Sequence, residues 1–390
     1  MTEVDVAKAR RDTPGCEHVL HFNNAGSALP PKQVVDAVVE HLNLEAEIGG
    51  YEAYEKKLEK IEHFYDATAQ MLGCKPQEIA FASSATRAWD SLFYSFTFHR
   101  GDRILTGRSE YASNFIAFLQ TAQKTGVSIE VIGVDEYGRV SIPGLEKMID
   151  SRVKLIAITH VPTNGGLVNP AAEIGRIANA AKIPFLLDAC QSMGQMPLNV
   201  RDLGCDMLSA TGRKFLRGPR GTGLLFIREP LLQQLEPPVL DMYSAEWTAP
   251  QKYEMRQDAR RFEEWEQYYA GKIGLATAVD YALVWGLENI RNRVFSLAEH
   301  LRTSLTKIPG VRVYDLGVEK CGIVTFRREG KDPEKMKEEL AAQKINVTVS
   351  SPLGTRLDME ARGLERLVRA SVHYYNTEDE VGRFCRAISS

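Results

Sequence analysis

The sequence predicts an α/β protein whose larger domain is built on a mostly parallel β-sheet. The middle of the chain alternates short apolar runs with segments of helical periodicity, the order typical of strand–helix–strand units. The apolar runs are nearly continuous, as expected of parallel strands covered on both faces. After about residue 268 longer helical segments lead to short strands, which indicates a second, smaller α+β domain. A length of 390 residues fits two domains.

Six apolar runs are expected to form the strands of the large sheet: Arg103–Thr106, Ile129–Val134, Lys154–His160, Ile183–Asp188, Met207–Ala210 and Gly223–Ile227. A helix is predicted between the third and fourth runs. Asn169 can cap it and Pro170 fits its first turn, while Ile174 and Ile177 lie on one face. Because ligands bind at the carboxyl ends of such strands, the residues just after them carry the functional information.

The smaller domain is expected to contain two long helices, three short strands and a last helix after Thr377. The helices are Lys272–Leu287 and Ile290–Ile308, and the strands are Val311–Tyr314, Cys321–Arg327 and Asn346–Val349. We therefore expect a large domain at residues 15–267 and a small one at 268–390. Residues 1–30 are predicted to pack on either.

Composition excludes several classes of protein. The formal net charge of −3 gives no reason to expect a nucleic-acid or anionic-membrane partner. No apolar run is long enough for a membrane span, and the charged N-terminal segment lacks an apolar signal core. The six cysteines are scattered and expected to stay reduced, so a cytoplasmic location is predicted. No motif indicates a metal site.

Two charged residues follow predicted strands of the large sheet. Asp188 ends the apolar run Ile183–Asp188, where an acid needs a cation or a hydrogen-bond donor as partner. Its alternative role is to cap the next turn. Lys214 follows the run Met207–Ala210, and a lysine in such a crevice can have its pKa lowered and attack carbonyl groups. A surface lysine is the alternative.

Two further segments suggest anion binding. Ser83–Ala88 is a small polar turn that leads into a helix, where main-chain N–H groups suit a phosphate, although an ordinary N-cap is also consistent. In the small domain, Arg369, Ser371 and His373 are expected on one strand face. Arg369 suits a substrate carboxylate, and the alternative is a solvated charge.

Together these segments resemble the class V aminotransferase and cysteine desulfurase family, fold-type I enzymes that use pyridoxal phosphate. The similarity runs along most of the chain, in the order Asn23–Gly26, Glu110–Asn114, Thr159–Asn164, Asp188–Gln191, Thr211–Lys214 and Arg369–Ser371. It implies the fold-type I architecture, the cofactor pyridoxal 5'-phosphate, a small amino-acid substrate and a homodimer.

The resemblance also implies a role for individual residues. Lys214 is expected to form the Schiff base with the cofactor and to take the substrate's α-proton. Asp188 is expected to pair with the pyridine nitrogen, and Tyr111 to stack on the ring. Gln191, with Thr163 or Asn164, is expected to bind the phenolic oxygen of the cofactor. Its phosphate is expected to contact Ala85, Thr86, Thr211 and Arg213. The substrate is expected to contact Arg369 and Asn24.

Three reactions share the first steps that these residues support. We expect a carbon–sulfur β-lyase acting on cysteine or a cysteine derivative, with a class V aminotransferase or an isopenicillin N epimerase-like enzyme as the alternative. Desulfurases of this family carry a sulfur-accepting cysteine on a small-domain loop, and the matching stretch, Ile345–Gly354, has none. The sequence therefore predicts that the protein is not a persulfide-forming desulfurase.

Two other segments leave their roles open. Glu264 and Trp265 replace the Gly–Thr pair with which relatives reach the partner's phosphate, and interface packing is the preferred role for Trp265. Tyr51 and Tyr54 are candidates for contact with the substrate side chain or for ordinary surface aromatics.

Overall fold

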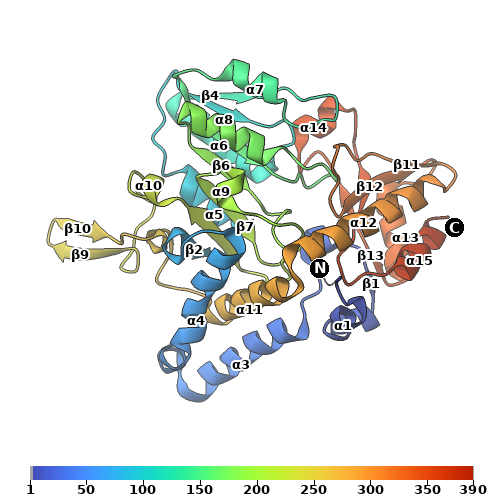
Figure 1. Cartoon of the computed structure of the whole chain (residues 1–390), viewed down its shortest axis with the longest axis horizontal. Helices are drawn as coiled ribbons and strands as arrows, with labels where there is room; N and C mark the ends of the chain where they lie inside the picture. The colour runs from blue at the N-terminus through green and yellow to red at the C-terminus, as the bar shows by residue number, and fades with distance from the viewer. Residues whose placement is uncertain (1–2, 390) are drawn as a thin grey trace.

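The computed structural model describes residues 3–389, and a seven-stranded sheet forms the centre of this part of the chain (Figure 1). The strand order is β2-β8-β7-β6-β5-β3-β4. Its members are β2 (Ile79–Ala82), β3 (Arg103–Thr106), β4 (Ser128–Val131), β5 (Val153–Thr159), β6 (Phe185–Asp188), β7 (Met207–Thr211) and β8 (Gly223–Ile227). Only β8 runs antiparallel to its neighbours β2 and β7, so the predicted mostly parallel α/β sheet is confirmed.

Alternate residues of the central strands are buried on opposite faces of the sheet. Leu105, Ile156 and Leu187 belong to one apolar cluster. Their chain neighbours Ile104, Leu155 and Leu186 belong to a second cluster. Successive side chains of a strand point to opposite faces, so a sheet with helices on both sides needs apolar residues at every position. This double burial explains why the runs are continuous in the sequence.

The helices surround this sheet and fill the C-terminal part of the chain. They are α1 (Val6–Arg11), α2 (Asn24–Ser27), α3 (Lys32–Ile48), α4 (Gly50–Leu72), α5 (Ala85–Phe93), α6 (Ala112–Thr125), α7 (Ile142–Met148), α8 (Ala171–Ala181), α9 (Val200–Leu203), α10 (Glu229–Leu232), α11 (Tyr269–Trp285), α12 (Leu287–Thr306), α13 (Pro333–Ala342), α14 (Arg356–Ala361) and α15 (Glu378–Ser389). Short 3₁₀ helices occur at Pro14–Glu17, Pro76–Glu78 and Ala259–Phe262. Within residues 3–389, no helix combines the length and apolarity that crossing a membrane requires.

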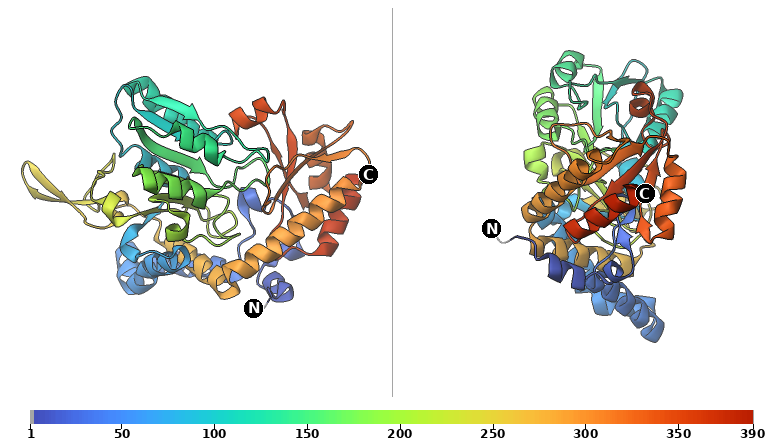
Figure 2. Two further views of the ribbon diagram at one scale, coloured as in Figure 1. Left: turned by 45° about the horizontal axis from the view of Figure 1, so that its top comes forward. Right: turned by 90° about the vertical axis from the view of Figure 1, so that its right-hand side faces the viewer.

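The C-terminal part contains a separate four-stranded antiparallel sheet, on the right in both views that show it beside the large sheet (Figures 1 and 2). Its order is β11 (Val311–Val313), β12 (Ile323–Arg328), β15 (Leu367–Ser371) and β14 (Thr348–Ser350). Strand β1 (Leu20–His21) pairs in parallel with β13 (Ile345–Asn346), which attaches the N-terminal segment to this part. The domain boundary at residues 267 and 268 stays a prediction.

A two-stranded hairpin, β9 (Ala245–Ala249) and β10 (Lys252–Met255), projects from the body of the molecule at the left of Figure 1. Trp247 and Tyr253 on this hairpin are 78% and 51% exposed. Large aromatic side chains exposed on a projecting element are typical of contact surfaces.

The start of α8 differs from the sequence-based expectation. Pro170, not Asn169, is the residue before the first turn, and it makes no side-chain cap. The Asn169 side chain instead accepts from Val140 N (3.0 Å) and donates to the carbonyl of Thr159 (2.8 Å). Asn169 therefore ties the end of β5 to a neighbouring loop, because those backbone groups are buried and need partners.

A buried ion pair supports strand β2. Neither the strand nor the ion pair was predicted from the sequence. Lys272 Nζ lies 3.3 Å from Glu263 Oε2, and each side chain is 1% exposed. Lys272 also donates to Tyr65 Oη (2.6 Å). Glu263 accepts from Phe81 N of β2 (2.8 Å), so the pair holds the strand that leads into the polar turn at Ser83.

Replacing Lys272 is expected to destabilise the protein strongly. Lys272→Met leaves the Glu263 carboxylate buried without its cation, at a cost of about 3–5 kcal/mol in the free energy of unfolding. The double variant Lys272→Met/Glu263→Gln should recover part of this loss. Chemical denaturation measures both.

Lys75→Met is the matched control, because the Lys75–Glu229 pair is more than half exposed on both sides and its loss should leave the unfolding midpoint unchanged. Equal effects of the two lysine substitutions would contradict the assigned importance of the buried pair.

Candidate active site

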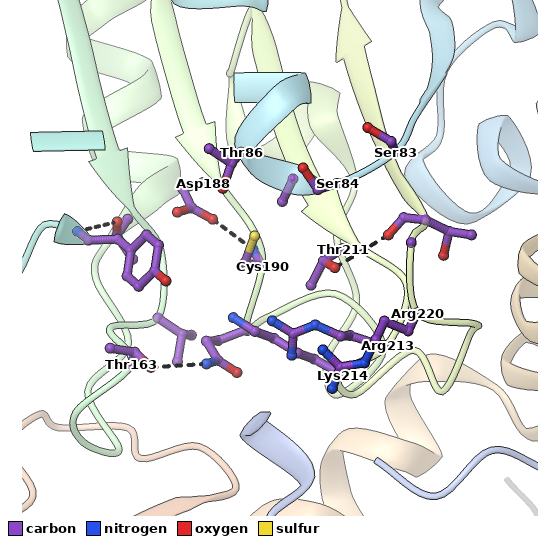
Figure 3. Close-up of a pocket in the computed structure, with 17 residues that line it drawn as sticks. Ser83, Ser84, Thr86, Thr163, Asp188, Cys190, Thr211, Arg213, Lys214 and Arg220 are labelled. Atoms are coloured by element: carbon purple, nitrogen blue, oxygen red, sulfur yellow. Dashed lines mark hydrogen bonds between the residues drawn. The ribbon is translucent and has the colours of Figure 1, made fainter. Parts of the chain in front are cut away.

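A cavity of about 290 Å³ lies at the carboxyl ends of β5, β6 and β7 and at the N-terminus of α5 (Figure 3). Its lining residues come from six segments of the chain: Ser83, Ser84, Ala85, Thr86, Tyr111, Thr159, Val161, Thr163, Asp188, Cys190, Gln191, Thr211, Arg213, Lys214, Arg220, Gly221 and Thr222. This is the sheet edge at which a parallel α/β fold brings strand ends together.

Asp188 is held rigidly at the end of β6. Its side chain is 4% exposed, and its two oxygens accept from Asn114 Nδ2 (3.0 Å) and from Cys190 N (2.9 Å). Donors on both oxygens replace the water that burial removes from the carboxylate. Asp188 therefore presents a fixed negative charge at the cavity.

Lys214 follows β7 and lies across the cavity from Asp188 (Figure 3). Burial lowers the pKa of its amine, and the cations Arg213 and Arg369 act in the same direction, whereas the charge of Asp188 opposes them. A lowered pKa increases the fraction of neutral amine, the form that attacks carbonyl carbon. The site thus contains a candidate nucleophile opposite a fixed carboxylate.

The start of α5 forms one wall of the cavity. Ser84 is its N-cap and its side chain accepts from Arg87 N (3.2 Å). Gly223 of β8 packs against this turn so closely that an added Cβ would lie 2.6 Å from the carbonyl carbon of Ser84. A helix N-terminus with Ser83, Thr86 and Arg213 beside it is suited to a phosphate.

Gln191 provides an acceptor that the protein leaves unused. Its Nε2 donates to the carbonyl of Ala25 (3.1 Å), while its buried Oε1 has no hydrogen-bond partner among the described residues. A buried polar atom without a partner is costly unless a bound group supplies one. The donor and acceptor set of this cavity therefore fits a ligand with a phosphate, a basic ring nitrogen and a hydroxyl that can donate to Gln191 Oε1.

Arg369 lies behind Thr163 and does not itself line the cavity. Its Nη1 donates to Thr163 Oγ1 (2.7 Å) and to the Thr163 carbonyl (2.9 Å). Burial lowers the pKa of Arg369 to about 10, with the charge of Arg213 contributing, so it is a cation at neutral pH. Its Nε is buried without a partner among the described residues. This leaves part of the guanidinium available to an anion.

The structure brings most of the predicted cofactor contacts together, but not all of the predicted residues. Ala85, Thr86, Tyr111, Thr163, Thr211 and Arg213 line the cavity with Asp188, Gln191 and Lys214. Asn164 points elsewhere, because its Nδ2 donates to Ser351 O (3.0 Å) and Thr355 Oγ1 (2.8 Å). Asn24 is fully buried and donates to the Ser371 carbonyl (2.7 Å). The individual roles of all these residues stay predictions.

Two groups of site residues were missed by the sequence analysis. Arg220 and Gly221 line the cavity from the turn before β8. Glu110 and Asn114 lie behind Asp188, both in a segment that carries the family resemblance. Glu110 could have been identified from its position, because it is a polar residue shortly after strand β3, at the edge of the sheet where ligands bind.

Comparisons with known proteins extend these findings. The family model described as aminotransferase class-V matches residues 20–384. A probable cysteine desulfurase of Methanothermobacter thermautotrophicus is 28% identical over 378 residues, which cover 95% of this chain and 94% of that protein. The apo structure of a cysteine desulfurase from Thermococcus onnurineus NA1 has a TM-score of 0.92 at 29% identity and covers 100% of this chain and 98% of that one.

The fold is shared more widely. A mutant of C-DES with glycine covalently linked to its pyridoxal phosphate has a TM-score of 0.88 at 22% identity, covering 98% of this chain and 99% of that one. The comparisons confirm the predicted fold-type I architecture, the family resemblance and the predicted cofactor, pyridoxal phosphate.

The comparisons also correct the predicted reaction. The exclusion of a persulfide-forming desulfurase is wrong, because the similar proteins across the whole chain are named cysteine desulfurases. The prediction was based on the absence of a cysteine from residues 345–354, and it took this absence to mean that the desulfurase reaction is absent too. Breaking the carbon–sulfur bond depends on the cofactor site, whereas the thiol that receives the sulfur is a separate group.

Lys214 is expected to carry the cofactor covalently. Borohydride reduction of the cofactor-loaded protein should add a stable label to the peptide that contains Lys214, and mass spectrometry locates it. Lys214→Ala should lose this label. Lys182→Ala, at the C-terminal end of α8 and away from the cavity, is the control that should keep it. A label on any other lysine in the wild-type protein would contradict the assignment.

Proposed function

The chain belongs to the class V aminotransferase family, and on that premise we propose that it is a cysteine desulfurase, which removes the sulfur of cysteine. The observation that carries the proposal is the convergence of Lys214, Asp188 and the α5 N-terminus on one cavity. Cysteine as the substrate is supported by the names of the similar proteins over the full chain.

Each part of the cavity has a distinct task in this proposal. The bound pyridoxal phosphate supplies an electron sink for the substrate's α-carbon. Asp188 faces the ring nitrogen and keeps it protonated through its charge. Lys214, with its lowered pKa, accepts the α-proton as a neutral amine and returns it. Thr211, Arg213 and the α5 N-terminus hold the phosphate.

Arg369 is proposed to bind the substrate carboxylate. Thr163 holds one end of the guanidinium through two hydrogen bonds, and the buried Nε has no partner among the described residues. A guanidinium anchored in this way loses little freedom when it binds a carboxylate, so the substrate is oriented at low entropic cost.

The sulfur of the substrate is proposed to be transferred to an acceptor thiol that comes from outside this site. L-Cysteine and an acceptor thiol give L-alanine and the persulfide of the acceptor, which balances all atoms. Cys190 is unsuited to this task, because burial and the charge of Asp188 raise the pKa of its thiol well above the usual range.

The turn Ser351–Gly354 borders the cavity wall, because Ala112 N, next to Tyr111, donates to Gly354 O (3.0 Å). Leu353 on this turn is 78% exposed. We infer that an acceptor approaches at this turn.

We further propose that the protein acts as a homodimer. Large apolar side chains are exposed on α3, α4 and α6, among them Val39 (47%), Tyr51 (74%) and Ile116 (65%). Apolar exposure on the packed helices α3 and α4, and separately on α6, supports association. Trp265, which is 46% exposed, also suits an interface.

We also propose a cytoplasmic location, which agrees with the six cysteines being unpaired.

Reaction products test the proposed reaction directly. The cofactor-loaded enzyme, L-cysteine and dithiothreitol as acceptor should release alanine and sulfide in equal amounts, because the dithiol reduces the persulfide it receives. Lys214→Ala is the control and should release neither. Release of pyruvate in place of alanine would overturn the desulfurase assignment.

Arg369 is expected to act mainly on substrate binding. Arg369→Ala removes charge-assisted hydrogen bonds worth about 1.5–3 kcal/mol, so kcat/KM for cysteine should fall roughly 10- to 100-fold, mostly through KM. Steady-state kinetics measure the change. Arg366→Ala, at an exposed arginine just before the same strand, should leave both constants unchanged. An unaltered KM in Arg369→Ala would contradict the carboxylate role.

A further inference from the structure

Behind Asp188 lies a second buried carboxylate that the proposed reaction does not use. Glu110 is 5% exposed and does not line the cavity. It accepts hydrogen bonds from Thr106 Oγ1 (3.1 Å), Tyr111 N (3.1 Å), Asn114 Nδ2 (2.8 Å), and both the main-chain N (3.0 Å) and the hydroxyl of Thr159. A carboxylate surrounded only by donors is held in one orientation.

One amide group connects the two acids. Asn114 Nδ2 lies 2.8 Å from Glu110 Oε1 and 3.0 Å from Asp188 Oδ2. An amide nitrogen carries two hydrogens, so each carboxylate receives one. Glu110 thereby decides how the amide of Asn114 is turned, because its carboxylate accepts from the nitrogen side and would repel the oxygen side. Asp188 consequently meets a donor and not an acceptor.

We propose that Glu110 is a positioning residue that acts through Asn114 on Asp188, fixing the orientation and charge of the carboxylate that faces the cofactor's ring nitrogen. The inference rests on the proposed placement of that nitrogen at Asp188. Glu110 touches neither cofactor nor substrate in this arrangement. In this proposal the Asn114 amide carries the effect of Glu110 to the ring nitrogen.

The protonation of Glu110 depends on the groups around its carboxylate. Burial raises the pKa of Glu110 to about 7, with the charge of Asp188 adding to it, while hydrogen bonds from Thr159, Asn114 and Tyr111 lower it. Both carboxylates bind the same amide, so the loss of charge on Glu110 weakens one of the two hydrogen bonds that orient the Asn114 side chain.

The same carboxylate also holds the residue predicted to stack on the ring. Tyr111 N donates both to Glu110 Oε1 and to Thr159 Oγ1 (3.3 Å). Tyr111 lines the cavity and precedes α6. A purely structural role for Glu110 is therefore the competing explanation, and the test must separate it from an effect carried by Asn114.

The experiment uses the full chain loaded with pyridoxal phosphate labelled with ¹⁵N in the ring. The ¹⁵N chemical shift reports whether the ring nitrogen is protonated. Glu110→Gln places an amide among the donors and weakens the hydrogen bond that orients the Asn114 amide, so Asp188 keeps a less well held donor. The ring nitrogen signal should then move toward the deprotonated value, and the cofactor dissociation constant should rise on the order of tenfold.

A double variant separates the two explanations. Asn114→Leu should shift the ¹⁵N signal in the same direction, and adding Glu110→Gln to it should cause no further shift. Additive shifts would mean that Glu110 acts through Tyr111 or Thr159 and would overturn the proposal. If Glu110→Gln does not fold, Glu110→Asp gives the same test, because its shorter side chain withdraws from Asn114.

Asp188→Asn distinguishes failure of the inference from failure of the proposed site. If this change moves the ¹⁵N signal and Glu110→Gln does not, only the role of Glu110 is overturned. If neither change moves it, the ring nitrogen does not face Asp188, and the proposed cofactor placement is overturned together with the inference.

Discussion

The active site depends on how the fold stabilises one negative charge at the edge of a buried sheet. Asp188 ends a strand whose neighbours are apolar on both faces, so its carboxylate has little access to water. Donors from Asn114 and from the main chain at Cys190 compensate for the lost hydration. The same burial lowers the pKa of Lys214. The cavity therefore combines a carboxylate held by donors with an amine whose pKa is lowered, and a neutral amine is the form that attacks carbonyl carbon.

Much of the central fold was predictable, because parallel strands buried on both faces leave continuous apolar runs. Strand β2 (Ile79–Ala82) was missed, and it owes its place to antiparallel pairing with β8, a partner far away in the sequence. Asn164 was expected at the cofactor and Asn24 at the substrate, because both lie in segments that resemble the family. Their side chains nevertheless bind Ser351 and Ser371, partners from distant segments that no local pattern indicates.

Buried polar pairs were the least predictable features. Glu263 looks like one more acid in a charged stretch, yet it accepts from Phe81 N and pairs with Lys272. Such pairs form only when elements from different parts of the chain enclose them. The error about the reaction has a related origin, because the absence of a cysteine in one loop was treated as evidence about chemistry performed elsewhere in the molecule.

The pairing of β1 with β13 has a consequence for how the polypeptide matures. Leu20 finds its strand partner only at Ile345, and Ala25 N donates to Ser371 Oγ (2.8 Å). The first strand to leave the ribosome thus waits until nearly the whole chain has been synthesised. The Ala25 carbonyl, which accepts from Gln191 in the cavity, belongs to this late-docking segment, so one support of the cavity wall depends on residues near the end of the chain.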